Sequence, residues 1–156
     1  MNSRAADVVR LLTVKGETLA VAESLTGGLV AADITGVPGA SKVFRGSVTA
    51  YATELKHRLL DVDATLLEQR GAVDPQVAAQ MAAGVRKALG ADWGIATTGV
   101  AGPDPQDGQP VGTVYVGIAT AAGTAAFEYA FSGSRAEIRG QACGAALERL
   151  LEALSG

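Results

Sequence analysis

Residues 18–36 read TLAVAESLTGGLVAADITG, and the fold follows from this stretch. An apolar run at 18–22 predicts a short buried strand, TGG at 26–28 predicts a tight turn, and residues 29–34 predict the start of a helix. Glu23 and Ser24 therefore lie between the end of a strand and the beginning of a helix. In open α/β sheets ligands bind there, because unpaired helix N–H groups and the helix dipole favour an anion. Such turns more often carry Ser and Gly simply as helix caps, so the motif alone leaves both interpretations open.

The same pattern occurs a second time. An apolar run at residues 93–98 ends in Thr97 and Thr98 and is followed by GVAGP at 99–103. If the two strands are neighbours in a parallel sheet, their polar ends face one crevice. Residues 104–110 are polar and contain two prolines, which predicts an exposed loop.

The remaining segments alternate between helical and strand patterns. Helices are expected at 3–14, at 53–60 with Thr53 as cap, at 64–69, after the Asp74-Pro75 start signal, and after the capping box of Ser134 and Glu137. Strands are expected at 45–51, 111–121 and 125–131, and the last two form an antiparallel hairpin. This order predicts a single α/β domain over residues 1–156 with mixed strand pairing.

Composition limits the classes of function. Hydrophobic residues make up 48% of the 156 residues, but aromatic residues only 4%, and there are 20 glycines, so helices and sheet are expected to pack closely through small side chains. A net charge of −3 without a Lys/Arg cluster argues against nucleic acid as a partner. No apolar stretch approaches the roughly 20 residues of a membrane span. The start of the chain is typical of an amphipathic helix and not of a secretion signal, so we expect a cytoplasmic protein without a membrane partner.

Elimination narrows the possible chemistry. The chain has one histidine, His57, and one cysteine, Cys143, which excludes an internal disulfide and argues against a zinc site. A Ser-His-acid triad would depend on His57, and Cys143 lies on the apolar side of a helix. The sequence has neither a Walker loop nor the dinucleotide fingerprint. A hydrolase without cofactor or metal would therefore need a hydroxyl that is activated by a lysine or a tyrosine.

Lys56 is the best-placed base. It falls in the first turn of a short helix, where the helix dipole lowers the pKa of an amine. The candidate hydroxyls near the ends of predicted elements are Ser24, Ser41, Ser47 and Thr98. Each residue also has a plainer interpretation. A lysine on a short helix is usually a solvated surface residue, Tyr51 could be a half-buried packing residue, and Glu23 could only cap the next helix. Arg135 and Arg139 could bind a phosphate or lie on the surface.

Six segments together resemble one family. They are AESLTGG at 22–28, VPGAS at 37–41, TAYATELK at 49–56, GAV at 71–73, TTGVAGPD at 97–104 and PVGT at 110–113. In this order they resemble the CinA C-terminal-domain family, whose stand-alone members include nicotinamide-nucleotide amidases of the PncC type. The resemblance implies a three-layer α/β/α sandwich with a mixed, mostly parallel central sheet. It also implies a homodimer or higher homo-oligomer.

The resemblance also implies an activity, the hydrolysis of the carboxamide of nicotinamide mononucleotide to nicotinic acid mononucleotide and ammonia, with no cofactor. Ser24 would be the nucleophile, Lys56 the base, and Tyr51 a proton relay or an orienting group. The residues implied to bind substrate are Glu23, Thr26, Gly27, Gly28, Ser41, Thr98, Gly99, Ala101, Gly102, Arg135 and Arg139. Backbone N–H groups at 26–28 or at 99–102 would hold the oxyanion or the phosphate, and which segment holds which stays open. The alternative is a non-catalytic domain that binds a nucleotide or a partner, linked to competence or DNA damage.

Overall fold

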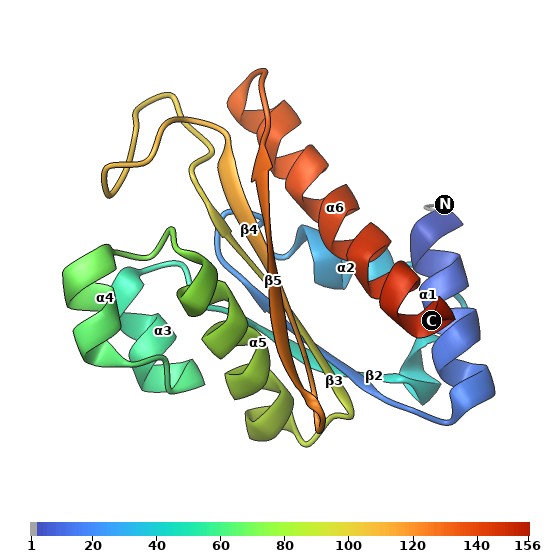
Figure 1. Ribbon diagram of the computed structural model, residues 1–156. Coiled ribbons are helices and arrows are strands. Elements are labelled where there is room, and N and C mark those ends of the chain that lie inside the picture. The colour runs from blue at the N-terminus through green and yellow to red at the C-terminus, as the bar shows by residue number, and fades with distance from the viewer. Residues whose placement is uncertain (1–2) are drawn as a thin grey trace.

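A computed structural model describes residues 3–156 as a five-stranded sheet between two layers of helices (Figure 1). The helices α1, α2 and α6 cover one face of the sheet, and α3, α4 and α5 cover the other. In chain order the elements are α1 (Ser3–Lys15), β1 (Leu19–Glu23), α2 (Leu29–Thr35), the short 3-10 helix η1 (Ala40–Lys42), β2 (Phe44–Thr49), α3 (Thr53–Leu60), α4 (Ala64–Arg70), α5 (Pro75–Leu89), β3 (Trp93–Gly99), β4 (Thr113–Thr120), β5 (Gly123–Ala130) and α6 (Arg135–Ser155). The expected α/β sandwich is confirmed.

The sheet has the order β2-β1-β3-β4-β5. β1 pairs in parallel with β2 and with β3, whereas β3–β4 and β4–β5 are antiparallel. The sheet is mixed as expected, but its described ladders divide evenly instead of being mostly parallel. β3 reaches β4 through a loop without a helix, whereas parallel strands are usually connected by a crossover helix.

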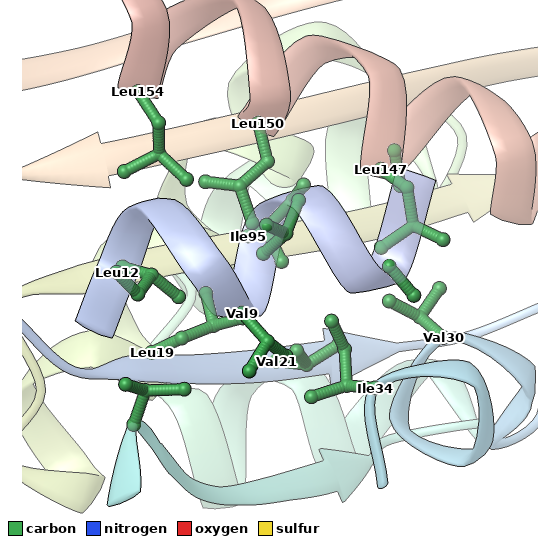
Figure 2. Close-up of a cluster of buried hydrophobic side chains, with 14 of the residues drawn as sticks. Val9, Leu12, Leu19, Val21, Val30, Ile34, Ile95, Leu147, Leu150 and Leu154 are labelled. Atoms are coloured by element: carbon green, nitrogen blue, oxygen red, sulfur yellow. The ribbon is translucent and has the colours of Figure 1, made fainter. Parts of the chain in front are cut away.

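Each side of the sheet has its own core. On one side Val21 and Ile95 pack with apolar residues of α1, α2 and α6, as Figure 2 shows for Leu12, Ile34 and Leu150. On the other side the strands present alanines to α5, and Gly94 and Gly117 lie so close to it that a Cβ would overlap carbonyl oxygens of α5. The small side chains of this sequence therefore let α5 approach the sheet.

Two predicted helix N-caps are confirmed, and a third is wrong. The Asp74 carboxylate accepts hydrogen bonds from the backbone of Gln76 (2.9 Å) and Val77 (3.2 Å), and Ser134 and Glu137 form the capping box. Thr53 was expected to cap α3, but it is the first helical residue, and Ala52 is the N-cap without a side-chain hydrogen bond. Within residues 3–156, no helix has the length and apolar character needed to cross a membrane.

Candidate active site

A pocket of about 110 Å³ opens where β1 and β3 end. The parallel pairing of β1 with β3 brings the two polar strand ends together, as their repeated pattern predicts. Residues from three other parts of the chain, at 51, 72–73 and 135, complete the walls. The lining residues are Ser24, Leu25, Tyr51, Ala72, Val73, Thr98, Gly99, Val100, Ala101, Gly102, Asp104, Gln106 and Arg135.

Lys56 is buried behind this pocket, with only 1% of its surface exposed. The plainer interpretation of Lys56 as a solvated surface residue is therefore wrong. Its ammonium group donates hydrogen bonds to the Ser24 hydroxyl (2.9 Å) and to the backbone carbonyls of Ala50 (2.8 Å) and Tyr51 (3.2 Å). These three acceptors fix Nζ against Ser24 Oγ, which places a possible base next to a possible nucleophile.

Burial lowers the pKa of Lys56 from its usual 10.5 to about 8, and the negative charge of Asp107 opposes this shift. The main cause is thus desolvation of the ammonium group and not the helix dipole named from the sequence. A neutral amine has two N–H donors and one lone pair. The two carbonyls can take both donors, which leaves the lone pair for the Ser24 hydroxyl proton. The surroundings of Lys56 therefore match the needs of a neutral base.

Ser24 is held by a small hydroxyl network. Its backbone N–H donates to Thr97 Oγ1 (3.4 Å), and the hydroxyls of Thr97 and Thr26 share a hydrogen bond (2.8 Å). Thr26 and Thr97 are both buried, so Thr26 does not line the pocket. This network ties the turn after β1 to β3.

Glu23 is the cap of α2. Its buried carboxylate accepts hydrogen bonds from the backbone N–H groups of Gly28 (3.1 Å), Val30 (3.0 Å) and Ala31 (3.0 Å). The N–H of Gly27 donates to the Ser24 carbonyl (3.0 Å). The structure therefore does not bring Glu23 to the pocket, and the N–H groups of Gly27 and Gly28 are already used.

Other N–H groups remain available for an oxyanion. Within residues 3–156, the backbone N–H groups of Leu25, Ala101 and Gly102 have no hydrogen-bond partner, and all three residues line the pocket. Gly99 belongs to the same wall. Of the two segments whose backbone N–H groups were considered from the sequence, the one at 99–102 has unpaired N–H donors in the described chain. The N–H of Leu25 adds a further donor directly after Ser24.

The two arginines have different positions. Arg139 donates to the carbonyls of Leu25 (2.9 Å) and Thr26 (3.3 Å), which fastens the turn after β1 to α6. Arg135 lines the pocket and donates to the Gly102 carbonyl and to the Tyr51 hydroxyl (3.0 Å). Arg135 is therefore the arginine that can meet a ligand.

The side chains of Tyr51 and Ser41 do not contact the pair of Ser24 and Lys56, although Tyr51 lines the pocket. The Tyr51 side chain is 58% exposed and contacts Arg135, and in the described chain its phenol makes no hydrogen bond to Ser24 or Lys56. Only its backbone carbonyl reaches Lys56. Ser41 is exposed on η1, at the amino ends of β1 and β2, so the whole length of β1 separates it from Ser24.

Thr98 and the segment at 71–73 form the back wall. The buried Thr98 hydroxyl donates to the Ala72 carbonyl (2.7 Å), and Ala72 and Val73 line the pocket. The segment GAV was part of the resemblance, but no role followed for it. Asp104 and Gln106 were expected only as parts of an exposed loop, yet they reach the mouth of the pocket. Because both residues are far from Ser24 in the sequence, no local pattern indicated that they would line the same pocket.

Neither Cys143 nor His57 lines the pocket. The Cys143 thiol is buried on α6 and donates to Asp33 (3.3 Å), and burial raises its pKa far above the usual range. His57 lies on α3, and its Nδ1 is 2.8 Å from the carbonyl oxygen of Val62. Among the described residues, no group of three or more His, Cys, Asp or Glu side chains could hold a metal ion.

Several proteins of similar sequence are named CinA-like or competence-damage inducible proteins. A CinA-like protein of Frankia casuarinae is 51% identical over 96% of this chain and 34% of its own length. A putative competence-damage inducible protein of Desulforamulus reducens is 46% identical over 96% of this chain and 36% of its own length. The chain thus spans about a third of the length of these curated relatives.

Solved structures match over the full length. A CinA superfamily protein of Klebsiella pneumoniae superposes with a TM-score of 0.94 at 30% identity, covering 99% of both chains. The competence/damage inducible protein CihA of Agrobacterium tumefaciens gives a TM-score of 0.89 at 32% identity, covering 100% of this chain and 98% of the other. The family model described as CinA C-terminal domain matches residues 1–154. The chain therefore belongs to the CinA C-terminal domain family.

Proposed function

We propose that this domain is an amidohydrolase that converts nicotinamide mononucleotide to nicotinic acid mononucleotide and ammonia. The observation that carries the proposal is the buried Lys56, whose Nζ lies 2.9 Å from Ser24 Oγ and whose pKa is lowered to about 8 by burial. A lysine in such surroundings can act as a general base near neutral pH. The substrate itself comes from the family resemblance.

The first half of the reaction acylates the serine. Neutral Lys56 takes the hydroxyl proton as Ser24 Oγ attacks the carboxamide carbon, and a C–O bond forms while the carbonyl π pair moves to oxygen. The open N–H groups of Leu25, Ala101 and Gly102 are the available donors to that oxyanion. Collapse re-forms the carbonyl and breaks the C–N bond, and the Lys56 ammonium gives its proton to the departing ammonia.

The second half restores the enzyme. Neutral Lys56 takes a proton from a water molecule, whose oxygen attacks the acyl carbon. Collapse breaks the bond to Ser24 Oγ, and Lys56 returns the proton to that oxygen. The sum is one water consumed, with one carboxylic acid and one ammonia released. The whole cycle needs only Ser24, Lys56 and backbone donors.

The shape of the site supports entry of one end of the substrate. A volume of about 110 Å³ is smaller than the roughly 300–1,000 Å³ of pockets that enclose a whole ligand. The carboxamide end therefore occupies the pocket, and the nucleotide part extends past its mouth. Arg135 stands at that mouth as the pocket's cation and is the proposed partner of the 5′-phosphate.

The test is the release of ammonia from nicotinamide mononucleotide by the purified protein. Ser24→Ala and Lys56→Met are each expected to lower kcat by about 10³-fold or more, because each removes a reacting group. The exposed Ser47 and Lys42 supply matched controls, and Ser47→Ala and Lys42→Met are expected to keep full activity.

Two outcomes would contradict the proposal. Absence of turnover in the native protein, with ligand binding unchanged in Lys56→Met, would indicate a non-catalytic binding domain. Full activity in Ser24→Ala would leave an amidase but assign the nucleophile to another hydroxyl or to water.

A further inference from the structure

Tyr51 contacts two functional parts of the pocket through different atoms. Its backbone carbonyl accepts a hydrogen bond from Lys56 Nζ (3.2 Å), whereas its hydroxyl accepts one from Arg135 Nη2 (3.0 Å). The bond to Arg135 is the only hydrogen bond of the phenol within residues 3–156. The backbone of Tyr51 therefore contacts the proposed base, and its side chain contacts the cation at the pocket mouth.

Arg135 is held by two acceptors. It is the first residue of α6, and its guanidinium donates to the Gly102 carbonyl as well as to the Tyr51 hydroxyl. Gly102 follows β3 and Tyr51 follows β2, so the two acceptors come from separate segments of the pocket wall. Arg135 and Tyr51 are both exposed residues, and burial therefore does not fix either side chain. The hydrogen bonds are what orders the guanidinium.

This order matters for the binding of an anion. An exposed arginine samples many rotamers, and fixing its side chain against a ligand costs conformational entropy. The two acceptors restrict Arg135 before a ligand arrives, which lowers that cost at the moment of binding. A guanidinium has several N–H donors in a planar fork, and the two contacts leave others for the oxygens of an anion. Arg135 is thus a cation that is oriented in advance.

We propose that the Tyr51 phenol is a positioning group, which orients Arg135 at the pocket mouth for the phosphate of the nucleotide and transfers no proton in the reaction. The resemblance implied a proton relay or an orienting group. The observed contacts support an orienting group whose partner is Arg135. The kinetic part of this inference rests on the proposed function, whereas its binding part, the affinity for the product nucleotide, needs no turnover.

Tyr51→Phe removes only the phenolic oxygen and keeps the carbonyl that holds Lys56. Because Arg135 loses one of its acceptors, we expect the KM for nicotinamide mononucleotide to rise about fivefold. The kcat should stay within about twofold of the native value, because no reacting group is removed. Loss of a proton relay would instead lower kcat.

The experiment adds Arg135→Ala, the double variant and a control. Arg135→Ala removes the cation and should raise KM about tenfold, and Tyr51→Phe should add nothing in that background, because the phenol acts only through Arg135. Tyr129→Phe is the matched control, since its hydroxyl accepts from Arg149 (2.6 Å) and neither residue lines the pocket. Steady-state kinetics give kcat and KM, and calorimetry gives the Kd of nicotinic acid mononucleotide. The control should keep the native values.

A kcat in Tyr51→Phe that falls about tenfold or more would overturn the proposal in favour of a relay. Unchanged KM and Kd in Tyr51→Phe, or additive losses in the double variant, would show that the phenol does not act through Arg135. If the native protein bound the product nucleotide but released no ammonia, and Tyr51→Phe alone weakened that binding about fivefold relative to Tyr129→Phe, the proposed function would fail and the positioning role would stand. Absence of binding to the native protein would overturn both.

Discussion

The turn after β1 and the loop after β3 resemble each other in sequence, but they use their backbone groups in opposite ways. In the first, Glu23 occupies three N–H groups of the start of α2, and Arg139 occupies two carbonyls. In the second, the N–H groups of Ala101 and Gly102 have no partner within residues 3–156. The first region carries Ser24 and has these backbone groups hydrogen-bonded, whereas the second has, in the described part of the chain, unpaired N–H groups in the wall of the pocket. Two strand ends of similar sequence thus form different walls of one pocket.

Glu23→Ala should have the largest effect on stability, because it removes the acceptor of the hydrogen bonds that distinguish the first region. It leaves three N–H groups at the buried start of α2 without an acceptor, and we expect a loss of about 3–4 kcal/mol in the free energy of unfolding. Urea unfolding measures it. Ser134→Ala, which removes a cap on the exposed start of α6, should cost only about 1 kcal/mol. Equal losses in the two variants would show that burial does not distinguish the Glu23 cap.

Lys56, which contacts Ser24 in the first region, should make the stability of the protein depend on pH. The unfolded chain keeps the Lys56 proton up to a pKa of 10.5, while the folded protein releases it near 8. Between these values the unfolded state binds more protons, so the free energy of unfolding rises with pH, by up to about 3 kcal/mol. Urea unfolding at pH 7, 8.5 and 10 should show this rise in native protein relative to Lys56→Met. If the free energy of unfolding changed with pH in the same way in both proteins, the pKa of Lys56 would not be lowered by folding.

Substitution of the two arginines should have smaller effects, which differ between the two regions. Arg139→Ala loses two hydrogen bonds to the turn that holds Ser24, so we expect about 1–2 kcal/mol lower stability and a reduced kcat. Arg135→Ala should leave stability within about 0.5 kcal/mol and raise KM about tenfold, because Arg135 faces the pocket mouth. Thermal unfolding and steady-state kinetics give both numbers. A reversed pattern would exchange the roles assigned to the two residues.

Local patterns predicted much of the fold. The alternation of strands and helices, the caps Asp74 and Ser134, and the repeated strand ends all depend on neighbours a few residues apart, and the structure confirms them. The cap at Thr53 was misplaced by one residue, because a helix boundary depends on weak terminal contacts. Elimination and the resemblance also led to the pair of Ser24 and Lys56, whose side chains meet in the structure.

The roles that were missed or misplaced depend on contacts between distant segments. Arg135 and Arg139 look alike in the sequence, and only the packing of α6 turns one to the pocket and the other to the β1–α2 turn. The position of Ser41 follows from the direction of β2, which puts η1 at the opposite end of the sheet. Asp107 reaches Ala72 across 35 residues of chain.

The sequence by itself determined the element order, the small-residue core and the chemical candidates, because these follow from periodicity, composition and the few reactive side chains present. The tertiary structure alone decided that Lys56 is buried against Ser24 and that Glu23 accepts hydrogen bonds from the start of α2 and does not line the pocket. The physical reason is that desolvation and hydrogen-bond saturation depend on which atoms surround a group in space. Neither quantity is a property of neighbouring residues along the chain.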